Sequence, residues 1–218
     1  MNRRHVLARA GALTPLVATL AALAACSKTD PAPAASGASP AAPQATTAAA
    51  SAAPAEGSGA ITPARALELA ATGNGFTVGP MMAANTVYIF FDTQCPHCAA
   101  LWQASTEVRS KFKMQWMPVA FMAKISQPQG AAIITAKDPA ALMTENETLL
   151  MQRKGGLDVT TLQPSAEAMA KVAANTELLK QLGADSVPMI YFKNQRTGQP
   201  GSHSGAMPAA ALVEMVGA

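Results

Sequence analysis

The stretch from Val87 to Trp102 reads VYIFFDTQCPHCAALW. Its first half combines β-branched and aromatic residues, a composition typical of a strand that is buried on both faces. A short polar turn follows, and two cysteines with the spacing Cys-x-x-Cys then begin a helical pattern. One face of that helix is predicted to pack on a core, because residues suited to a core recur at three- and four-residue steps: Leu101, Trp102, Ser105, Val108 and Phe112.

Cys95 and Cys98 occupy the start of the predicted helix. Pro96 suits the first helical position, where a backbone N–H would have no partner inside the helix. Cys95 then lies at the helix N-terminus, where unpaired N–H groups and the positive end of the helix dipole face its sulfur. This environment favours a thiolate over a thiol and indicates a redox site.

A Cys-x-x-Cys pair also occurs in zinc sites, in c-type haem sites and as a structural disulfide. A structural zinc site needs about four ligands, but beyond residue 25 the chain has one such pair and two histidines, His97 and His203. A c-type haem site needs a histidine directly after the second cysteine, where this chain has Ala99. A structural disulfide over so few residues would remove little entropy from the unfolded chain. We therefore favour the redox interpretation and expect no metal.

The motif and its flanks resemble the thioredoxin-fold disulfide oxidoreductases of the bacterial envelope. Cys95-Pro96-His97-Cys98 is the active-site tetrapeptide typical of DsbA-type oxidants. The surrounding sequence is more similar to the DsbG and DsbC proteins, over about residues 76–218. That similarity is carried by Phe91-Asp92, Leu101-Trp102-Gln103, Ala136-Lys137-Asp138-Pro139-Ala140, Asn175, Leu182-Gly183 and Val187-Pro188-Met189-Ile190-Tyr191.

The resemblance implies an α/β thioredoxin fold, in which helices flank a central mixed sheet and a helical insertion separates the β-α-β and β-β-α halves. It implies that Cys95 is the exposed nucleophile and that Cys98, one turn inside the helix, resolves the mixed disulfide. His97, when protonated, would add positive charge near the Cys95 thiolate. Pro188 matches the cis-proline that faces the motif in this fold, and Val187 before it would offer backbone groups to an extended substrate strand.

Cysteines in such positions have pKa values of ~3.5–7.5, compared with ~8.5 for an unperturbed thiol, and DsbA is among the examples of that range. We therefore expect Cys95 to be largely a thiolate at neutral pH. A stabilised reduced form makes the disulfide form a stronger oxidant. The sequence predicts a comparatively oxidising redox potential.

Two features differ from the relatives. Many thioredoxin-fold enzymes place a buried acid six residues before the first cysteine, where this chain has Ile89. A proton relay would then depend on Asp92 or on water, although Asp92 is better suited to capping the turn before the helix. DsbC and DsbG also carry an N-terminal dimerisation domain, whereas a low-complexity segment and about twenty residues precede the similarity here. We expect a monomer.

Residues 1–25 have the features of an export signal. Arg3, Arg4 and Arg9 precede an apolar stretch that Pro15 interrupts, which is too short for a mature transmembrane helix. Arg3-Arg4 leaves twin-arginine export open as an alternative to the general route. These arginines account for the whole formal charge of +3, so the mature chain is near neutral and its charge does not indicate nucleic-acid binding.

The end of this segment, Leu23-Ala24-Ala25-Cys26, resembles a lipobox. The resemblance implies cleavage before Cys26 and acylation of that cysteine, and an ordinary signal peptide with an unpaired cysteine is the alternative. Acylation would leave Cys95 and Cys98 as a closed pair. Residues 26–60 are rich in Ala, Pro, Ser and Thr, so they cannot bury enough apolar surface to fold, and we expect a disordered tether.

Residues 61–218 have the usual size of one domain, the predicted catalytic domain. Caps, prolines, glycines and apolar spacing predict its elements. These are a helix from Pro63, a strand at Phe76–Val78, a strand at Met114–Phe121, helices over Ala131–Ala136, from Pro139 to Met151 and from Ser165 to Leu182, a strand at Val187–Phe192, a last strand ending at Ser204 and a closing helix from Pro208.

We predict a periplasmic thiol:disulfide oxidoreductase that is anchored to the envelope membrane by a lipid on Cys26 and acts on exported proteins. The redox-active disulfide of Cys95 and Cys98 would serve without any other cofactor. As an oxidant the protein would need a membrane partner of DsbB type, and as a reductant one of DsbD type; the direction is open. A different class also fits: a non-catalytic thioredoxin-fold module that binds extended peptide segments beside Pro188.

Overall fold

The computed structural model of the chain describes residues 61–83 and 85–218. The predicted signal peptide at 1–25 and the predicted tether at 26–60 lie outside the described residues. Cys26 belongs to the predicted tether and is not a described residue, so its acylation stays a prediction.

Five strands form one mixed sheet in the order β1-β3-β2-β4-β5. β2 and β3 are parallel, whereas β1 pairs antiparallel with β3, β4 with β2, and β5 with β4. The central place of β2 explains its continuous apolar run, because such a strand has neighbours on both edges and helices over both faces. The strands are β1 (Phe76–Val78), β2 (Thr86–Asp92), β3 (Lys113–Val119), β4 (Met189–Lys193) and β5 (Pro200–Ser204).

The predicted β-α-β unit is formed by β2, helix α2 (Pro96–Thr106) and β3. α2 is shorter than the apolar spacing predicted, because Val108 and Phe112 follow the helix in a turn, although both are buried. The Val108 N–H bonds the Ser105 carbonyl three residues earlier, which tightens the end of the helix. The two side chains still reach the core from the connection to β3.

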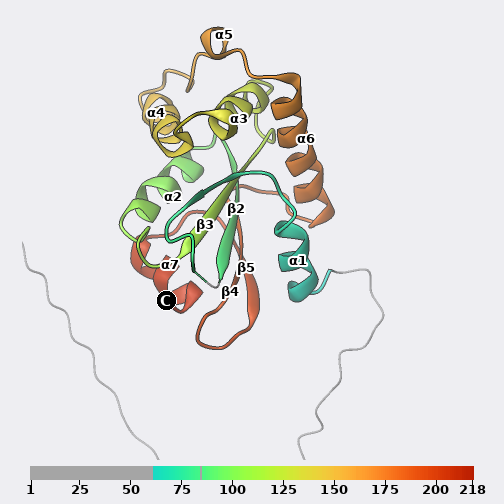
Figure 1. Cartoon of the computed structure of the whole chain (residues 1–218), viewed down its shortest axis with the longest axis vertical. Helices are drawn as coiled ribbons and strands as arrows, with labels where there is room; N and C mark the ends of the chain where they lie inside the picture. Colours follow the sequence, from blue (N-terminus) through green and yellow to red (C-terminus); the bar gives the residue numbers. More distant parts are fainter. Residues whose placement is uncertain (1–60, 84) are drawn as a thin grey trace, which may run out of the picture. The chain divides into compact units, whose positions relative to one another are not determined.

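Helices cover both faces of the sheet (Figure 1). α2 and α7 share one core cluster with the sheet, and α1 and α6 share another on the opposite face. α3, α4 and α5 lie together at one end of the sheet (Figure 1) and follow β3 in the chain, as the predicted helical insertion. The remaining helices are α1 (Pro63–Ala70), α3 (Ser126–Thr135), α4 (Pro139–Met151), α5 (Val159–Leu162), α6 (Ala166–Gln181) and α7 (Ala209–Val216).

Three predicted helix starts are confirmed by side-chain caps. Thr62, Asp138 and Ser165 each accept a hydrogen bond from the backbone N–H three residues later, and they begin α1, α4 and α6. The predicted start of α3 at Ala131 is wrong, because the helix begins at Ser126. No side chain caps α3, so its first turn carries no capping signal in the sequence. The short helix α5 was not predicted.

Alternate residues of β2 pack on opposite faces of the sheet. Ile89 and Phe91 belong to the cluster on the α2–α7 side, whereas Phe90 belongs to the cluster on the α1–α6 side. On the α2–α7 side, the rings of Trp102 and Trp116 pack edge to face, with their centroids 5.0 Å apart. Full burial of a large apolar side chain contributes ~1.5–3 kcal/mol relative to exposure, so these residues hold α2 firmly on the sheet.

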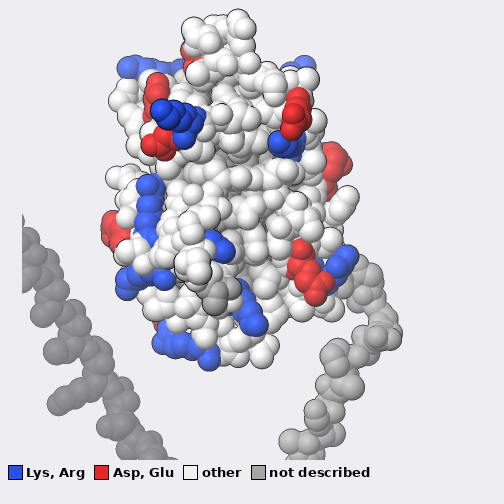
Figure 2. Space-filling view, in the orientation of Figure 1, with Lys and Arg blue, Asp and Glu red and all other residues white. Residues whose placement is uncertain are grey.

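Charged residues (Asp, Glu, Lys and Arg) make up 13% of the chain. On the face shown in Figure 2, acidic and basic side chains lie side by side near the upper end, and basic side chains predominate toward the lower end. Among residues 61–83 and 85–218, no helix combines the length and apolarity needed to cross a membrane.

Candidate active site

Cys95 is the N-cap residue of α2. Its Sγ accepts a hydrogen bond from the backbone N–H of Cys98 at 3.3 Å, as serine and aspartate oxygens do at other helix starts. Pro96 occupies the first helical position, and both Pro96 and His97 are exposed. The start of α2 therefore lies at the protein surface, and its two cysteines face inward.

The prediction that Cys95 is exposed is wrong. Cys95 is 2% exposed and Cys98 is fully buried, and both belong to the core cluster on the α2–α7 side. The thiol donates a hydrogen bond to the carbonyl oxygen of Val187 at 3.5 Å. The segment before β4 therefore lies over the sulfur of Cys95. Both cysteines are free thiols in this structure.

Val187 and Pro188 lie where the resemblance placed them. Their peptide bond is cis, as predicted. Pro188 is buried directly before β4, and its carbonyl oxygen accepts a hydrogen bond from the N–H of Gly205 at 2.8 Å. The end of β5 thereby fixes the segment that covers Cys95.

The two thiols have opposite pKa shifts. A hydrogen bond from the Cys98 thiol lowers the pKa of Cys95 to about 7, against burial, which raises it; the backbone N–H groups of Cys98 and His97 lower it further, and the charge of Asp92 raises it. Burial, followed by the interaction with Cys95, raises the pKa of Cys98 well above its ordinary value. Near neutral pH, Cys95 is the thiol that ionises, while Cys98 keeps its proton.

Asp92 ends β2 and is fully buried. It caps the turn as predicted, because its Oδ1 accepts a hydrogen bond from the N–H of Gln94 at 2.8 Å. Three further hydrogen bonds, of 2.6–2.8 Å, come from the backbone N–H groups of Phe121 and Met122 and the hydroxyl of Ser126. Four donors fill the acceptor positions of this carboxylate, so it is a structural anchor for the turn and for the chain that leaves β3.

A polar network joins the turn before Cys95 to the helical insertion. Gln129 of α3 accepts hydrogen bonds from the Thr93 hydroxyl at 2.9 Å and from the Gln94 amide at 2.6 Å. The Gln129 amide in turn donates to the carbonyl oxygens of Gly155 and Leu157. Since Gln129 is fully buried, this network replaces the water that its polar groups would otherwise require.

Asn146 of α4 extends the same network. Its amide donates to the Thr93 carbonyl at 3.0 Å, and its Oδ1 accepts from the N–H of Leu157 at 3.1 Å. Neither Gln129 nor Asn146 was predicted as a site residue. No signal in the sequence marks them, because Asn146 stands among other polar residues of α4 and Gln129 lies before the predicted start of α3 at Ala131.

Glu147 is a third site residue that was not predicted. It is 4% exposed, and burial raises its pKa to about 8, with smaller contributions of the same sign from the charges of Cys95 and Asp92. Met143, Glu147 and Leu150 are separated by steps of four and three residues, a spacing that brings side chains to one helix face. An acidic residue on the same helix face as two apolar residues is the sequence feature that could have indicated a buried carboxyl group at Glu147.

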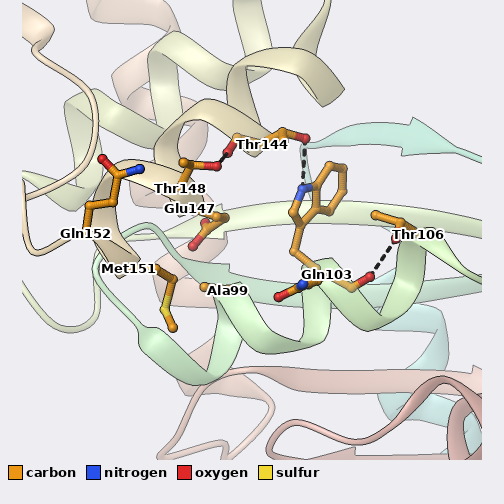
Figure 3. Close-up of a pocket in the computed structure, with 9 residues that line it drawn as sticks. Ala99, Gln103, Thr106, Thr144, Glu147, Thr148, Met151 and Gln152 are labelled. Atoms are coloured by element: carbon orange, nitrogen blue, oxygen red, sulfur yellow. Dashed lines mark hydrogen bonds between the residues drawn. The ribbon is translucent and has the colours of Figure 1, made fainter. Parts of the chain in front are cut away.

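A cavity of about 400 Å³ opens between α2 and α4 (Figure 3). Figure 3 shows Glu147 pointing from α4 toward Ala99 of α2, the residue after Cys98. The two helices are tied together on one wall of the cavity, where Trp102 Nε1 donates to the hydroxyl of Thr144 at 3.1 Å. The cavity therefore reaches the first turn of the helix that carries both cysteines.

Other candidate groups lie away from these contacts. His203 is part of β5, where it pairs with Ile190 of β4. Within residues 61–83 and 85–218, no group of three or more His, Cys, Asp or Glu side chains is arranged to hold a metal ion.

Fold and site together define a thioredoxin-fold protein. A Cys-x-x-Cys pair begins the helix of a β-α-β unit, and a cis-proline before the next strand faces the first cysteine. The solved structures agree. A variant of ScsC from Proteus mirabilis has a TM-score of 0.56 at 19% identity, over 71% of this chain and 80% of that chain. A periplasmic thioredoxin-like protein from Salmonella enterica serovar Typhimurium has a TM-score of 0.53 at 18% identity, over 69% and 93%. The predicted fold class is confirmed.

The chain is similar to the thiol:disulfide interchange protein DsbG of Pseudomonas aeruginosa, with 30% identity over 141 residues, or 62% of this chain and 52% of that protein. DsbG of Escherichia coli is 32% identical over 111 residues, or 50% of this chain and 44% of that protein. The chain thus spans about half the length of the curated relatives it matches. No protein-family model matches it. The predicted resemblance to the DsbG proteins is confirmed.

Proposed function

We propose that the chain is a thiol:disulfide oxidoreductase that works through Cys95 and Cys98. The opposite pKa shifts of the two thiols carry this proposal. Cys95 can ionise and act as a nucleophile near neutral pH, whereas Cys98 stays protonated until the second step. Thiol–disulfide exchange needs this division between an attacking and a resolving thiol. The similarity to the DsbG proteins supports the same activity.

In the reducing direction, the Cys95 thiolate attacks one sulfur of a substrate disulfide. A mixed disulfide forms, the substrate S–S bond breaks, and the other substrate sulfur leaves as a thiolate. Cys98 then loses its proton and attacks Cys95 Sγ, which releases the first substrate sulfur and closes the disulfide of Cys95 and Cys98. Two electrons pass to the substrate, and oxidation of a substrate dithiol is the reverse sequence. The disulfide is itself the redox group, so the proposal includes no other cofactor.

The substrate would approach from the side of Val187 and Pro188. In the free protein the Val187 carbonyl accepts a hydrogen bond from the Cys95 thiol, and this hydrogen bond is lost when the thiol ionises and stays absent in the mixed disulfide. The backbone of Val187 then becomes available to pair with an extended substrate segment. His97, exposed in the first turn of α2, adds positive charge near the sulfur when it is protonated.

The proposed substrates are exported proteins, and the proposed location is the periplasm. The DsbG relatives and a structural neighbour described as periplasmic support this placement. A lipid on Cys26 would hold the protein at the envelope membrane. A membrane partner of DsbB type would reoxidise it as an oxidant, and one of DsbD type would reduce it as a reductant.

The burial of Cys95 favours a second candidate function, a non-catalytic module that binds extended peptides beside Pro188. The two candidates separate in one experiment. The reduced protein is mixed with a disulfide-bonded peptide, and the rate of peptide reduction is compared for the wild type, Cys95→Ser and Cys98→Ser. We expect Cys95→Ser to abolish reduction, because no other described thiol has a lowered pKa. We expect Cys98→Ser to accumulate a mixed disulfide, detected by mass spectrometry.

Equal behaviour of the wild type and Cys95→Ser would contradict the oxidoreductase. If both proteins also bound the peptide with the same affinity, the binding module would be the better description. The wild type and both variants need the same near-ultraviolet circular dichroism spectrum, since Cys95 belongs to the core cluster.

A further inference from the structure

Glu147 is a buried carboxyl group with a free oxygen. Its Oε1 accepts one long hydrogen bond from the Asn146 amide at 3.3 Å, whereas Oε2 has no hydrogen-bond partner among the described residues. No salt bridge of the described residues includes Glu147. An unpartnered buried carboxyl group destabilises the fold, and such an exception calls for a specific explanation.

The position of Glu147 suggests what it does. α4 packs directly against α2, and Glu147 faces the first turn of α2 across the cavity between the two helices (Figure 3). The charge of Glu147 acts on the Cys98 thiol, and the charge of Cys95 acts on Glu147. Glu147 is thus electrostatically coupled to both cysteines and also lines a space of about 400 Å³, large enough to admit water.

Cys98 needs a proton acceptor when it attacks the mixed disulfide. It is fully buried, so its proton cannot pass directly to bulk solvent. Asp92 is unsuited to this task, because four donors already occupy its oxygens. Ile89, at the position six residues before Cys95, has no polar group.

We propose that Glu147 accepts the proton of the Cys98 thiol as the disulfide of Cys95 and Cys98 closes, and exchanges it with solvent that enters the cavity between α2 and α4. This inference rests on the proposed function. The step is balanced: the carboxylate becomes a carboxylic acid, the Cys98 thiolate attacks Cys95 Sγ, and the substrate sulfur leaves with the electron pair of the broken bond. In the oxidising direction the carboxylic acid returns the proton to Cys98.

The charges around Glu147 match the timing of this step. Apart from burial, the hydrogen bond from Asn146 lowers its pKa and the charges of Cys95 and Asp92 raise it. The charge of Glu147 in turn raises the pKa of Cys98, whereas Glu145 on the same helix is exposed. While Cys95 is a thiolate, its charge helps to raise the pKa of Glu147 and keeps the proton on the carboxyl group. Formation of the mixed disulfide removes that charge. Glu147 then ionises more readily, at the point where a base is required.

The full chain in its reduced form, with Cys26 replaced by Ser in every variant so that it contributes no third thiol, provides the test, with 5,5′-dithiobis(2-nitrobenzoate) as the disulfide substrate. Attack by Cys95 releases one coloured nitrothiobenzoate and leaves a second as a mixed disulfide. Attack by Cys98 releases that second equivalent. The two phases are recorded by stopped flow as a function of pH in the wild type, in Glu147→Gln and in Glu145→Gln, which is the matched control on the exposed side of α4.

We expect Glu147→Gln to slow the second phase at least about tenfold at neutral pH, because general bases contribute about 10²–10⁴-fold. The first phase should change less than about twofold, since it needs no proton from Cys98. The wild-type second phase should level off by about pH 8, because without the charge of Cys95 the pKa of Glu147 in the mixed disulfide is lower than its value of about 8 in the reduced protein. The rate of Glu147→Gln should keep rising with hydroxide. Glu145→Gln should match the wild type in both phases.

Glu147→Ala adds a second readout, because formate can enter the space left by the side chain. Formate should accelerate the second phase of Glu147→Ala in proportion to its concentration and leave the first phase unchanged. A role limited to holding the fold would produce neither the change in pH profile nor the rescue. A normal second phase in both Glu147 variants overturns the inference while the proposed function stands. A first phase that persists in Cys95→Ser overturns the proposed function itself.

Discussion

The thiol of Cys95 lies 3.5 Å from the carbonyl oxygen of Val187, although 92 residues separate them in the sequence. The contact joins the start of α2 to the segment that enters β4, so the site is completed by the two halves of the fold. It also accounts for the burial of the sulfur at a helix start whose next two residues are exposed. The thiol gives up this hydrogen bond when it ionises to attack a substrate disulfide, which makes the Val187 carbonyl part of the reactivity of Cys95.

The pKa of Cys95 depends first on its partner thiol. Replacing Cys98 by Ala removes the hydrogen bond that lowers this pKa most, so we expect the pKa to rise from about 7 toward its ordinary value. The thiolate fraction at pH 7 would fall from about one half to a few per cent. The measurement is the ultraviolet absorbance of the thiolate as a function of pH.

Cys98→Ser is the matched control for this titration, because its hydroxyl keeps a hydrogen-bond donor at the same place. Its midpoint should lie between those of the wild type and Cys98→Ala. Equal midpoints for the wild type and Cys98→Ala would show that backbone N–H groups and the dipole of α2 are sufficient to lower the pKa of Cys95, without the hydrogen bond from Cys98.

Replacing Glu147 by Gln should stabilise the protein at high pH. Burial raises the pKa of Glu147 from 4.5 to about 8, so the folded state holds this proton more tightly than the unfolded state. Its contribution is therefore fully present below pH 4.5 and is lost as the pH rises through about 8. Between pH 6 and pH 9 the wild type should lose about 2–3 kcal/mol relative to Glu147→Gln.

Urea denaturation of both proteins across this range measures the difference. The lowered pKa of Cys95 acts in the opposite sense, adding stability as the pH rises from about 7 toward 9. That contribution is present in both proteins and cancels in the comparison, apart from the coupling between the charges of Cys95 and Glu147. A pH-independent difference would mean that Glu147 does not titrate in the folded protein.

The network around Asn146 should affect both stability and reactivity. Asn146→Ala leaves the Thr93 carbonyl and the Leu157 N–H without their partner, which should cost about 2–4 kcal/mol in the free energy of unfolding. Because Thr93 precedes the active-site turn, the variant should also change the rate at which Cys95 is alkylated by iodoacetamide. Urea denaturation and alkylation kinetics provide the two readouts.

Asn175→Ala separates the two effects. Asn175 is equally buried and makes three hydrogen bonds of 2.7–2.9 Å, to Asn74 and Pro118. Its loss should destabilise the protein to a similar degree but leave the alkylation rate of Cys95 unchanged. The same rate change in both variants would reduce the role of Asn146 to general stability.

Two neighbouring glycines provide a test of the loop that closes this network. Gly155 and Gly156 both have positive φ values, of 77° and 78°. A Cβ at Gly155 would meet nothing within 4 Å, whereas a Cβ at Gly156 would lie 2.6 Å from Asn146 Oδ1 and 2.9 Å from Gln129 Nε2. Gly155→Ala should cost about 1–2 kcal/mol, the backbone penalty alone.

Gly156→Ala should cost clearly more than Gly155→Ala and should change the alkylation rate of Cys95, because the new methyl group displaces network side chains. Thermal unfolding of the two variants under identical conditions makes the comparison. Equal costs would contradict the close packing of the network around Gly156.

Local sequence was sufficient for the central elements. The apolar run of β2, the proline after Cys95 and the caps at Thr62, Asp138 and Ser165 each act within a few residues, so they can be read along the chain. The resemblance carried by Val187 and Pro188 added one distant part of the site. The start of α3 was missed because that helix has no capping side chain.

Packing between distant segments settled the rest. The cover over Cys95 comes from Val187, the turn before it is held by Gln129 and Asn146, and the free carboxyl group comes from Glu147. Helical spacing predicts which residues lie on the same face of a helix, but it does not predict which other segment packs against that face. Cys95, Cys98 and the helix start were therefore evident from one stretch of sequence. The pKa values of the two thiols depend on the surroundings that form when the helical insertion and the segment before β4 pack against that stretch.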